Sequence, residues 1–306
     1  MREKKAGGRI RTIALAVAPG LFVFLWSTGW IAARAAAIDC DPLTFLAARF
    51  GCALVLFLWL VGVMGLPWPQ RRGDIAHAMM SGVLLHAGYL GGVWWAVGQG
   101  VPAGISAVLA ATQPVMTAML APMLLRERIS ARQWTGIALG FVGIIVVLLP
   151  RLQAATGADF GRLQVALLVN MVAMILVTLG TFYQKRFLPS GDLRTTAMLQ
   201  YAGAVPVIAA AAYLLEPDLR FTISLTSLAT MAWSVIAISL GAILLYLWLI
   251  REGAVSKSAS LIYLVPAASA IEAWLLFGEQ LTALQITGIV VTIAGVALAT
   301  RASITR

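Results

Sequence analysis

The sequence predicts an all-α integral membrane protein with ten transmembrane helices, arranged as two five-helix repeats of inverted topology around a central cavity. Three features support this fold class: an apolar composition, an internal repeat and an uneven distribution of basic residues. Of the 306 residues, 61% are hydrophobic and 11% are charged, whereas a soluble domain is about half apolar and about a quarter charged. A soluble fold of this length could not bury so much apolar surface, so we expect lipid to be the solvent.

Ten apolar segments are long enough to cross a bilayer, which takes a helix of about 20 residues. They are residues 12–33, 42–63, 75–98, 102–124, 132–149, 162–182, 193–214, 226–250, 254–277 and 282–300. The connecting segments are short, so no soluble domain remains. The first segment follows a basic stretch as a signal peptide does, but its apolar run exceeds the usual 7–15 residues. We interpret it as a retained span.

The two halves of the chain share a pattern with an offset of 152 residues and no gap. The matched pairs are Pro114 and Pro266, Ala118 and Ala270, Glu127 and Glu279, Gln133 and Gln285, Thr135 and Thr287, Gly136 and Gly288, and Gly143 and Gly295. Each half holds five spans, an odd number, so the second half must be inverted relative to the first. We predict repeats over residues 12–150 and 162–300.

The basic residues predict the orientation of the chain. With the N-terminus inside, 17 of the 22 Lys and Arg residues fall on inner segments, as the positive-inside rule requires. Both termini are then cytoplasmic. Arg126 and Arg128, on an inner turn, become Gly278 and Gln280 on the matched outer turn. The net charge of +10 therefore reports topology, and we expect no nucleic-acid partner.

An inverted repeat of this kind favours secondary transport. Two related halves can exchange conformations and open a central site to each side in turn.

The sequence has no GxxxxGK[ST], HExxH or GxSxG motif, so we expect no catalytic residues, no cofactor and no enzymatic activity. Cys40 and Cys52 have no metal-ligand spacing, so no metal site is expected. The expected partners are a small-molecule substrate and the lipid bilayer, and one chain is enough for a functional monomer.

Several motifs resemble the ten-helix drug/metabolite transporter superfamily with two EamA domains. They are Trp26-Ser27-Thr28-Gly29-Trp30, Ala48-Arg49-Phe50, Leu125-Arg126-Glu127-Arg128-Ile129-Ser130 and Gln133-Trp134-Thr135-Gly136, with later copies at 277–282 and 285–288. His86-Ala87-Gly88-Tyr89 with Trp94-Trp95 is similar to the YddG-type exporters of aromatic and other neutral amino acids. The resemblance implies an amino acid exporter of the bacterial inner membrane. Residues 179–183 are a degenerate copy of the first motif, so we expect unequal roles for the halves.

The candidate substrate-binding residues are aromatic or polar side chains inside spans. His86 lies near the midplane, where ionisable groups usually face a cavity or a partner, and Tyr89 follows on the same helical face. Trp26 and Trp30 form a similar pair on the first span. The remaining candidates are Gln113, Tyr246 and Tyr263. Aromatic walls with a few polar tips suit an amphipathic ligand, although packing aromatics around a bonded histidine would give the same pattern.

Four further residues are candidates for a hinge or gate. Pro114 and Pro266 lie at the same depth of the fourth and ninth spans, and each removes a backbone hydrogen bond. They either bend the helices as a hinge or only shape them. Arg49 and Glu272 lie at similar depths near the outer side, so we predict that they can pair, structurally or as an outer gate. A proton-coupling role for Glu272 is the alternative.

The cavity is expected to be lined by spans 1, 3, 4, 6, 8 and 9, with spans 5 and 10 packed outside it. Trp94, Trp95 and Trp248 lie nearer span ends and are predicted to be interfacial. Three other functions remain open: a multidrug or nucleotide-sugar-like carrier, a membrane-embedded lipid-modifying enzyme and a channel. Competing substrates, lipid turnover and non-saturating flux would distinguish them.

Overall fold

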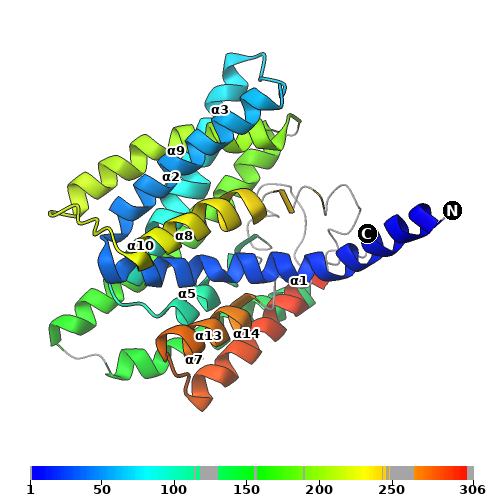
Figure 1. The fold of residues 1–306 in the computed structure, drawn as a ribbon. Coiled ribbons are helices and arrows are strands. Elements are labelled where there is room, and N and C mark those ends of the chain that lie inside the picture. The colour runs from blue at the N-terminus through cyan, green and yellow to red at the C-terminus, as the bar shows by residue number, and fades with distance from the viewer. Residues whose placement is uncertain are drawn as a thin grey trace.

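The computed structural model describes residues 2–113, 115–117, 130–154, 157–188, 190–242, 244–245, 248 and 265–301. Within this part of the chain, each of the ten predicted spans contains a helix (Figure 1). The predicted fold class is therefore confirmed. The start of α1 and the end of α14 lie at the same end of the bundle (Figure 1), as an even number of spans requires.

The helices follow the predicted spans closely. The first half contains α1 (Arg2–Asp39), α2 (Pro42–Val63), a third span made of α3 (Arg72–Gly82), η1 (Val83–Gly88) and α4 (Tyr89–Gly98), then α5 (Ala103–Ala110) and α7 (Ala131–Ala154). The second half contains α8 (Gly157–Phe187), α9 (Leu193–Leu215), α10 (Leu225–Ala232) continued by η2 (Trp233–Gly241), α13 (Val265–Phe277) and α14 (Ala283–Arg301).

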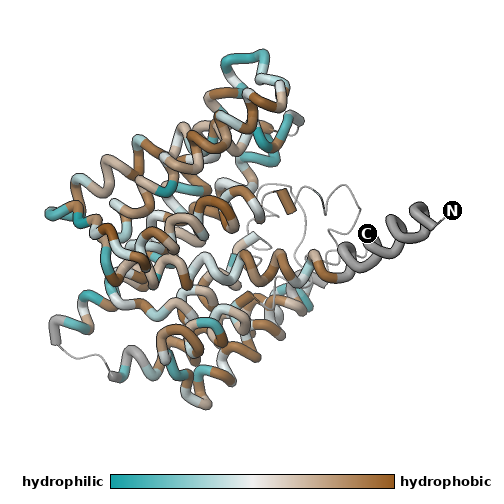
Figure 2. The backbone as a smooth tube through the Cα atoms, viewed as in Figure 1, coloured by the Kyte–Doolittle hydropathy of each residue, from teal (hydrophilic) through white to brown (hydrophobic). Residues whose placement is uncertain are grey.

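Five described segments are long and apolar enough to cross a membrane alone: Val17–Asp39, Pro42–Val63, Ala131–Pro150, Asp159–Phe187 and Leu193–Leu215. Their outward surfaces carry large apolar side chains such as Leu58, Val142, Leu168 and Leu214, and hydrophobic colour covers much of the bundle (Figure 2). Water would penalise so much exposed apolar surface, whereas lipid tails do not. The surface therefore fits a multi-pass membrane protein.

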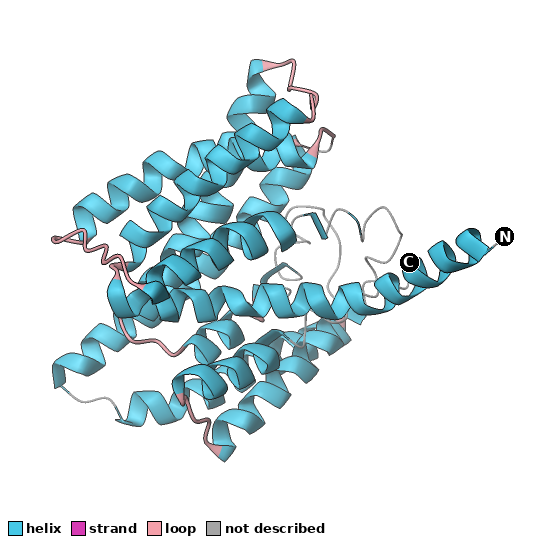
Figure 3. Cartoon of the chain, viewed as in Figure 1, coloured by secondary structure: helices cyan, strands magenta, loops and turns pink. Residues whose placement is uncertain are grey.

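Short loops join the helices (Figure 3), and two of them meet where α1 and α9 end. Cys40 and Phe221 form an isolated antiparallel bridge, Ser224 donates a hydrogen bond to Asp39, and Arg220 pairs with Asp41 at 3.7 Å. The connection from α1 to α2, in the first half, is thereby fixed to the connection from α9 to α10, in the second.

The crossing of α7 and α14 shows the internal repeat in three dimensions. A Cβ atom on Gly143 of α7 would come within 3.0 Å of the backbone of Thr292 in α14. A Cβ atom on Gly295 of α14 would come equally close to the backbone of Gly140 in α7. The offset of 152 residues exchanges these two contacts, so a pseudo-two-fold axis passes through the crossing. Small residues allow such close approach of membrane helices.

The starts of α7 and α14 repeat the same capping box. The Ser130 amide donates to Gln133 Oε1 at 2.8 Å, and the Gln133 amide donates to Ser130 Oγ at 3.3 Å. Thr282 and Gln285 make the matched bonds at 3.0 and 3.2 Å. Two orphan amides of each helix are satisfied in this way, which explains why the glutamine belongs to the repeated pattern.

Both halves contain a π-helical segment at the same place in the repeat. The offset of 152 residues relates η1 to residues 235–240, which lie within η2. A π-helical turn shifts the side chains that follow it and is frequent at functional sites. The hydropathy pattern did not predict these segments.

The helices α2 and α9, which occupy matched positions, pack against each other and are capped differently. The buried Glu216 carboxylate, just after α9, accepts hydrogen bonds from the amides of Leu43 and Thr44 at 2.7 and 2.8 Å. Asp192 caps α9 within its own half by accepting from the Arg194 amide at 2.9 Å. The Arg194 side chain also bonds to Asp192 and lowers the pKa of this carboxyl.

The glycine crossing gives a stability prediction. We expect Gly143→Ala to destabilise the protein by about 1–3 kcal/mol, because the added methyl group overlaps fixed backbone atoms of α14. Thermal unfolding in detergent should show a lower melting temperature than that of the parent protein. Gly62→Ala is the matched control, since a Cβ atom there meets open space. Equal melting temperatures for the two variants would contradict the close crossing.

Candidate functional site

A cavity of about 280 Å³ lies between the two halves of the bundle. It is lined by Trp26, Gly29, Trp30, Arg49, Leu85, His86, Tyr89, Leu90, Val93, Trp94, Gln113, Val177, Thr181, Tyr201, Ile238 and Ser239. These residues come from spans 1–4 and 6–8. Spans 2 and 7 were not predicted to line the cavity. Span 9 was, but none of its described residues does so.

Five of the predicted substrate-binding side chains meet in this cavity: Trp26, Trp30, His86, Tyr89 and Gln113. They come from α1, the third span and the segment that follows α5. The helical spacing within each span was predicted, and the packing of α1 against α4 brings the two aromatic pairs together. Two other candidates, Tyr246 and Tyr263, lie outside the described residues.

The cavity straddles the pseudo-two-fold axis. Three pairs of its lining residues are related by the offset of 152 residues: Arg49 and Tyr201, His86 and Ile238, and Gly29 and Thr181. Both halves therefore present the same backbone positions to the same space, but with different side chains.

His86 is held by aromatic rings. Its imidazole stacks on the Tyr201 ring with centroids 4.6 Å apart and an interplanar angle of 4°, and the Phe50 ring meets it edge-on at 5.8 Å. Within the described residues, neither ring nitrogen makes a hydrogen bond of normal geometry, although the Gln200 side chain interacts with the ring. The stack fixes the orientation of the ring. The η1 segment places this side chain on the cavity wall.

Arg49 is the charged residue among the described residues that line the cavity. It is only 3% exposed, and its Nη2 donates to Ser239 Oγ at 3.3 Å. Its Cζ lies 5.3 Å from the centroid of the Trp94 ring, a distance at which a cation–π attraction operates. Trp94 is itself 1% exposed, so the prediction that it is an interfacial residue was wrong: a position near a span end faces inward here.

Arg49 and Glu272 do not pair. Glu272 Oε1 instead accepts a hydrogen bond from Ser27 Oγ at 2.6 Å, which joins α13 to α1, while Arg49 contacts Ser239 of η2. The predicted pair is therefore wrong. The two residues lie at similar depths in their spans, but their side chains project from the helices in different directions.

The described residues include only one of the two predicted hinge prolines. Pro114 lies outside the described residues. Pro266 is the second residue of the described part of α13 and is buried. The stretch that precedes it, where the predicted bend would lie, is also outside the described residues.

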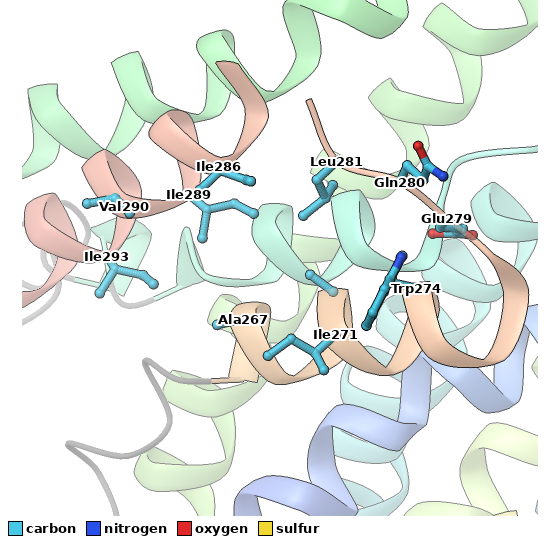
Figure 4. Close-up of a pocket in the computed structure, with 11 residues that line it drawn as sticks. Ala267, Ile271, Trp274, Glu279, Gln280, Leu281, Ile286, Ile289, Val290 and Ile293 are labelled. Carbon is cyan, nitrogen blue, oxygen red and sulfur yellow. The ribbon is translucent and has the colours of Figure 1, made fainter. Parts of the chain in front are cut away.

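A second hollow, of about 520 Å³, lies between α13 and α14. Its walls are mostly aliphatic, with Ile271 on α13 facing Ile286, Ile289 and Val290 on α14, and its polar residues gather at one end (Figure 4). Ile271, Trp274 and Val290 are more than half exposed, so this groove opens to the surroundings of the bundle. It suits lipid tails, which leaves the central cavity as the candidate site.

An aromatic and polar cavity between two inverted helical halves fits a membrane transport protein. The chain belongs to the EamA-like transporter family, whose model matches residues 13–149 and again 164–301. It is therefore a membrane transport protein.

Known relatives cover most of the chain. It is 27% identical, over 90% of its length and 87% of the relative's, to an Escherichia coli (strain K12) protein named as an uncharacterized inner membrane transporter, YedA. It is 23% identical to an Escherichia coli (strain K12) protein named as a probable amino-acid metabolite efflux pump, over 90% and 91% of the two chains. A solved crystal structure has the same fold, with a TM-score of 0.63 at 15% identity, covering 94% of this chain and 98% of the other.

The Ser27–Glu272 hydrogen bond can be tested by a double-mutant cycle. We expect Ser27→Ala to cost about 1–3 kcal/mol when Glu272 is present, because it leaves a buried carboxyl oxygen without its donor. The cost should be smaller in a Glu272→Leu background, so that unfolding free energies reveal a coupling between the two sites. Arg49→Gln combined with Glu272→Leu is the matched cycle and should be additive. Coupling only in that second cycle would restore the predicted ion pair.

Proposed function

We propose that the protein is a secondary transporter that exports amino acids, aromatic and other neutral ones, or similar small metabolites by alternating access. The observation that carries the proposal is the cavity on the pseudo-two-fold axis. Its walls combine aromatic faces from Trp26, Trp30 and Tyr89 with polar groups of His86 and Gln113. Such a lining suits a small molecule with a polar end and an apolar end.

The inverted halves support the mechanism. The matched residues Arg49 and Tyr201 lie on α2 and α9, and each helix is pinned at its N-terminus by a carboxylate. We infer that the halves act as units over residues 12–150 and 162–300 and exchange conformations around the cavity. A related efflux pump is named for amino-acid metabolites, which supports the substrate class.

We further infer that the protein lies in a bacterial inner membrane with both termini in the cytoplasm. The name of the YedA relative supports the compartment, and the positive-inside rule supports the orientation. A monomer is sufficient because both halves of the carrier belong to one chain.

A carrier of nucleotide sugars or of large drugs is the second candidate. The cavity volume of about 280 Å³ is close to the lower limit of the range of about 300–1,000 Å³ that drug-sized ligands use, which suits a small substrate. Among the described lining residues there is no carboxylate of the kind that a membrane-embedded hydrolytic enzyme would use as an acid or base. The size of the cavity and the lack of a carboxylate among its described lining residues both favour amino acid transport.

Counterflow in proteoliposomes tests the function. Vesicles loaded with unlabelled phenylalanine, methionine or threonine should accumulate the same labelled compound in a saturable way. We expect His86→Ala to lower this uptake at least about tenfold, and Tyr89→Phe to lower it less, because each removes a polar group from the cavity wall.

His77→Ala is the matched control, since His77 lies on the same span outside the cavity, bonded to the Tyr183 hydroxyl at 2.7 Å. It should transport like the parent protein. Absence of counterflow for every amino acid, with protein that elutes as a single folded species, would favour the drug or nucleotide-sugar carrier. Equal transport by the His86 and Tyr89 variants would remove both residues from the site.

A further inference from the structure

The cavity wall contains a buried positive charge that pairs with no carboxylate of the described residues. The ion pairs of the described residues join Arg34 to Glu279, Arg194 to Asp192 and Arg220 to Asp41. Arg49 belongs to none of them. Its guanidinium has the Ser239 hydroxyl and the Trp94 face as partners, and neither carries a negative charge.

An uncompensated buried charge is costly. Removing an ion from water costs several kcal/mol even after the protein relaxes. The interactions with one hydroxyl and one aromatic face offset only part of this cost. Charged groups inside membrane spans accordingly mark substrate or ion pathways when they face a cavity. Among the described residues no carboxylate pairs with Arg49, and the cavity beside it can hold an anionic ligand.

Unused hydrogen-bond donors surround this position. Arg49 Nε and Trp30 Nε1 are both buried and have no partner within the described residues. Both residues line the cavity, so a ligand bound there lies beside these donors. His86, whose ring nitrogens make no hydrogen bond of normal geometry among the described residues, lines the same cavity.

We propose that Arg49 is the anion-binding residue of the transport site and that it holds the carboxylate of the substrate, with Trp30 donating a further hydrogen bond. The inference rests on the proposed function, because it treats the central cavity as the transport site. The planar guanidinium presents donors in the geometry that a carboxylate accepts. The aromatic faces of Trp26 and Tyr89 remain for the apolar part of the substrate.

The charge of Arg49 also determines which ligands the site rejects. A ligand with a positive charge and no anionic group would meet Arg49 without any carboxylate among the described lining residues. Like charges at short distance in a poorly solvated space repel strongly. The cavity therefore selects carboxylates, including zwitterionic amino acids, over purely cationic amphiphiles.

Ligand pairs that differ only in the anionic group test the assignment. L-phenylalanine and phenylacetate should displace bound labelled L-phenylalanine from the purified protein, whereas L-phenylalaninamide and phenethylamine should be about tenfold to a hundredfold weaker, the range expected for a lost charge-assisted hydrogen bond. Phenylphosphonate distinguishes a carboxylate site from a phosphate site. It should compete less well than phenylacetate.

Variants then assign the preference to Arg49. In Arg49→Gln the ratio of affinities between L-phenylalanine and its amide should collapse toward one, and Arg49→Lys should retain part of it. Arg34→Gln is the matched control, since Arg34 lies on α1 with its side chain 43% exposed and should leave the ratio unchanged. An unchanged ratio in folded Arg49→Gln would overturn the proposal.

Other outcomes are also decisive. If Arg49→Gln does not fold, the parent protein decides, because equal competition by the acid and the amide overturns the proposal. If labelled L-phenylalanine does not bind, thermal stabilisation by phenylacetate and phenylphosphonate replaces displacement. Stabilisation by phenylacetate that is reduced in Arg49→Lys and lost in Arg49→Gln would retain the carboxylate site while the amino acid function fails. No stabilisation by either anion would overturn both.

Discussion

The constraint on which the structure depends is that two copies of one five-helix unit are packed in opposite orientations. Opposite orientation brings equivalent positions of the two halves face to face, so one close contact is made twice. Gly143 against Thr292 and Gly295 against Gly140 are the two copies of such a contact. The capping boxes at Ser130 and Thr282 show that the repeated residues have the same structural task in each half. A central cavity on the axis follows from this arrangement.

The halves share a scaffold but differ in chemistry where they meet. At matched positions of α2 and α9 one half has Arg49 and the other has Tyr201, and beside them His86 is matched by Ile238. The first half thus supplies the cation and the imidazole, while the second supplies the ring on which the imidazole stacks. In the proposed mechanism, the symmetric backbone serves movement in both directions, and the asymmetric side chains would give the substrate one defined orientation.

The spans, the repeat and much of the cavity wall followed from the sequence, because depth within a span and helical spacing are local properties. Trp26, Trp30, His86 and Tyr89 were identified in that way. Depth does not define the direction in which a residue projects, and for this reason the Arg49–Glu272 pair was predicted wrongly. The inward position of Trp94 depends on how the third span packs, which no local pattern records. Tyr201 could have been found, since it is related to Arg49 by the repeat offset.

We propose that one cavity between the inverted halves opens to each side of the membrane in turn. Thr181, on the cavity wall, provides a probe when changed to cysteine in a chain whose Cys40 and Cys52 are replaced by alanine. Its rate of reaction with a membrane-impermeant thiol reagent should be measured from each side, with and without L-phenylalanine. Alternating access predicts that the reagent reacts with this cysteine from both sides of the membrane and that the amino acid slows the reaction from each side. Reaction from one side only, or rates that the amino acid leaves unchanged, would contradict it.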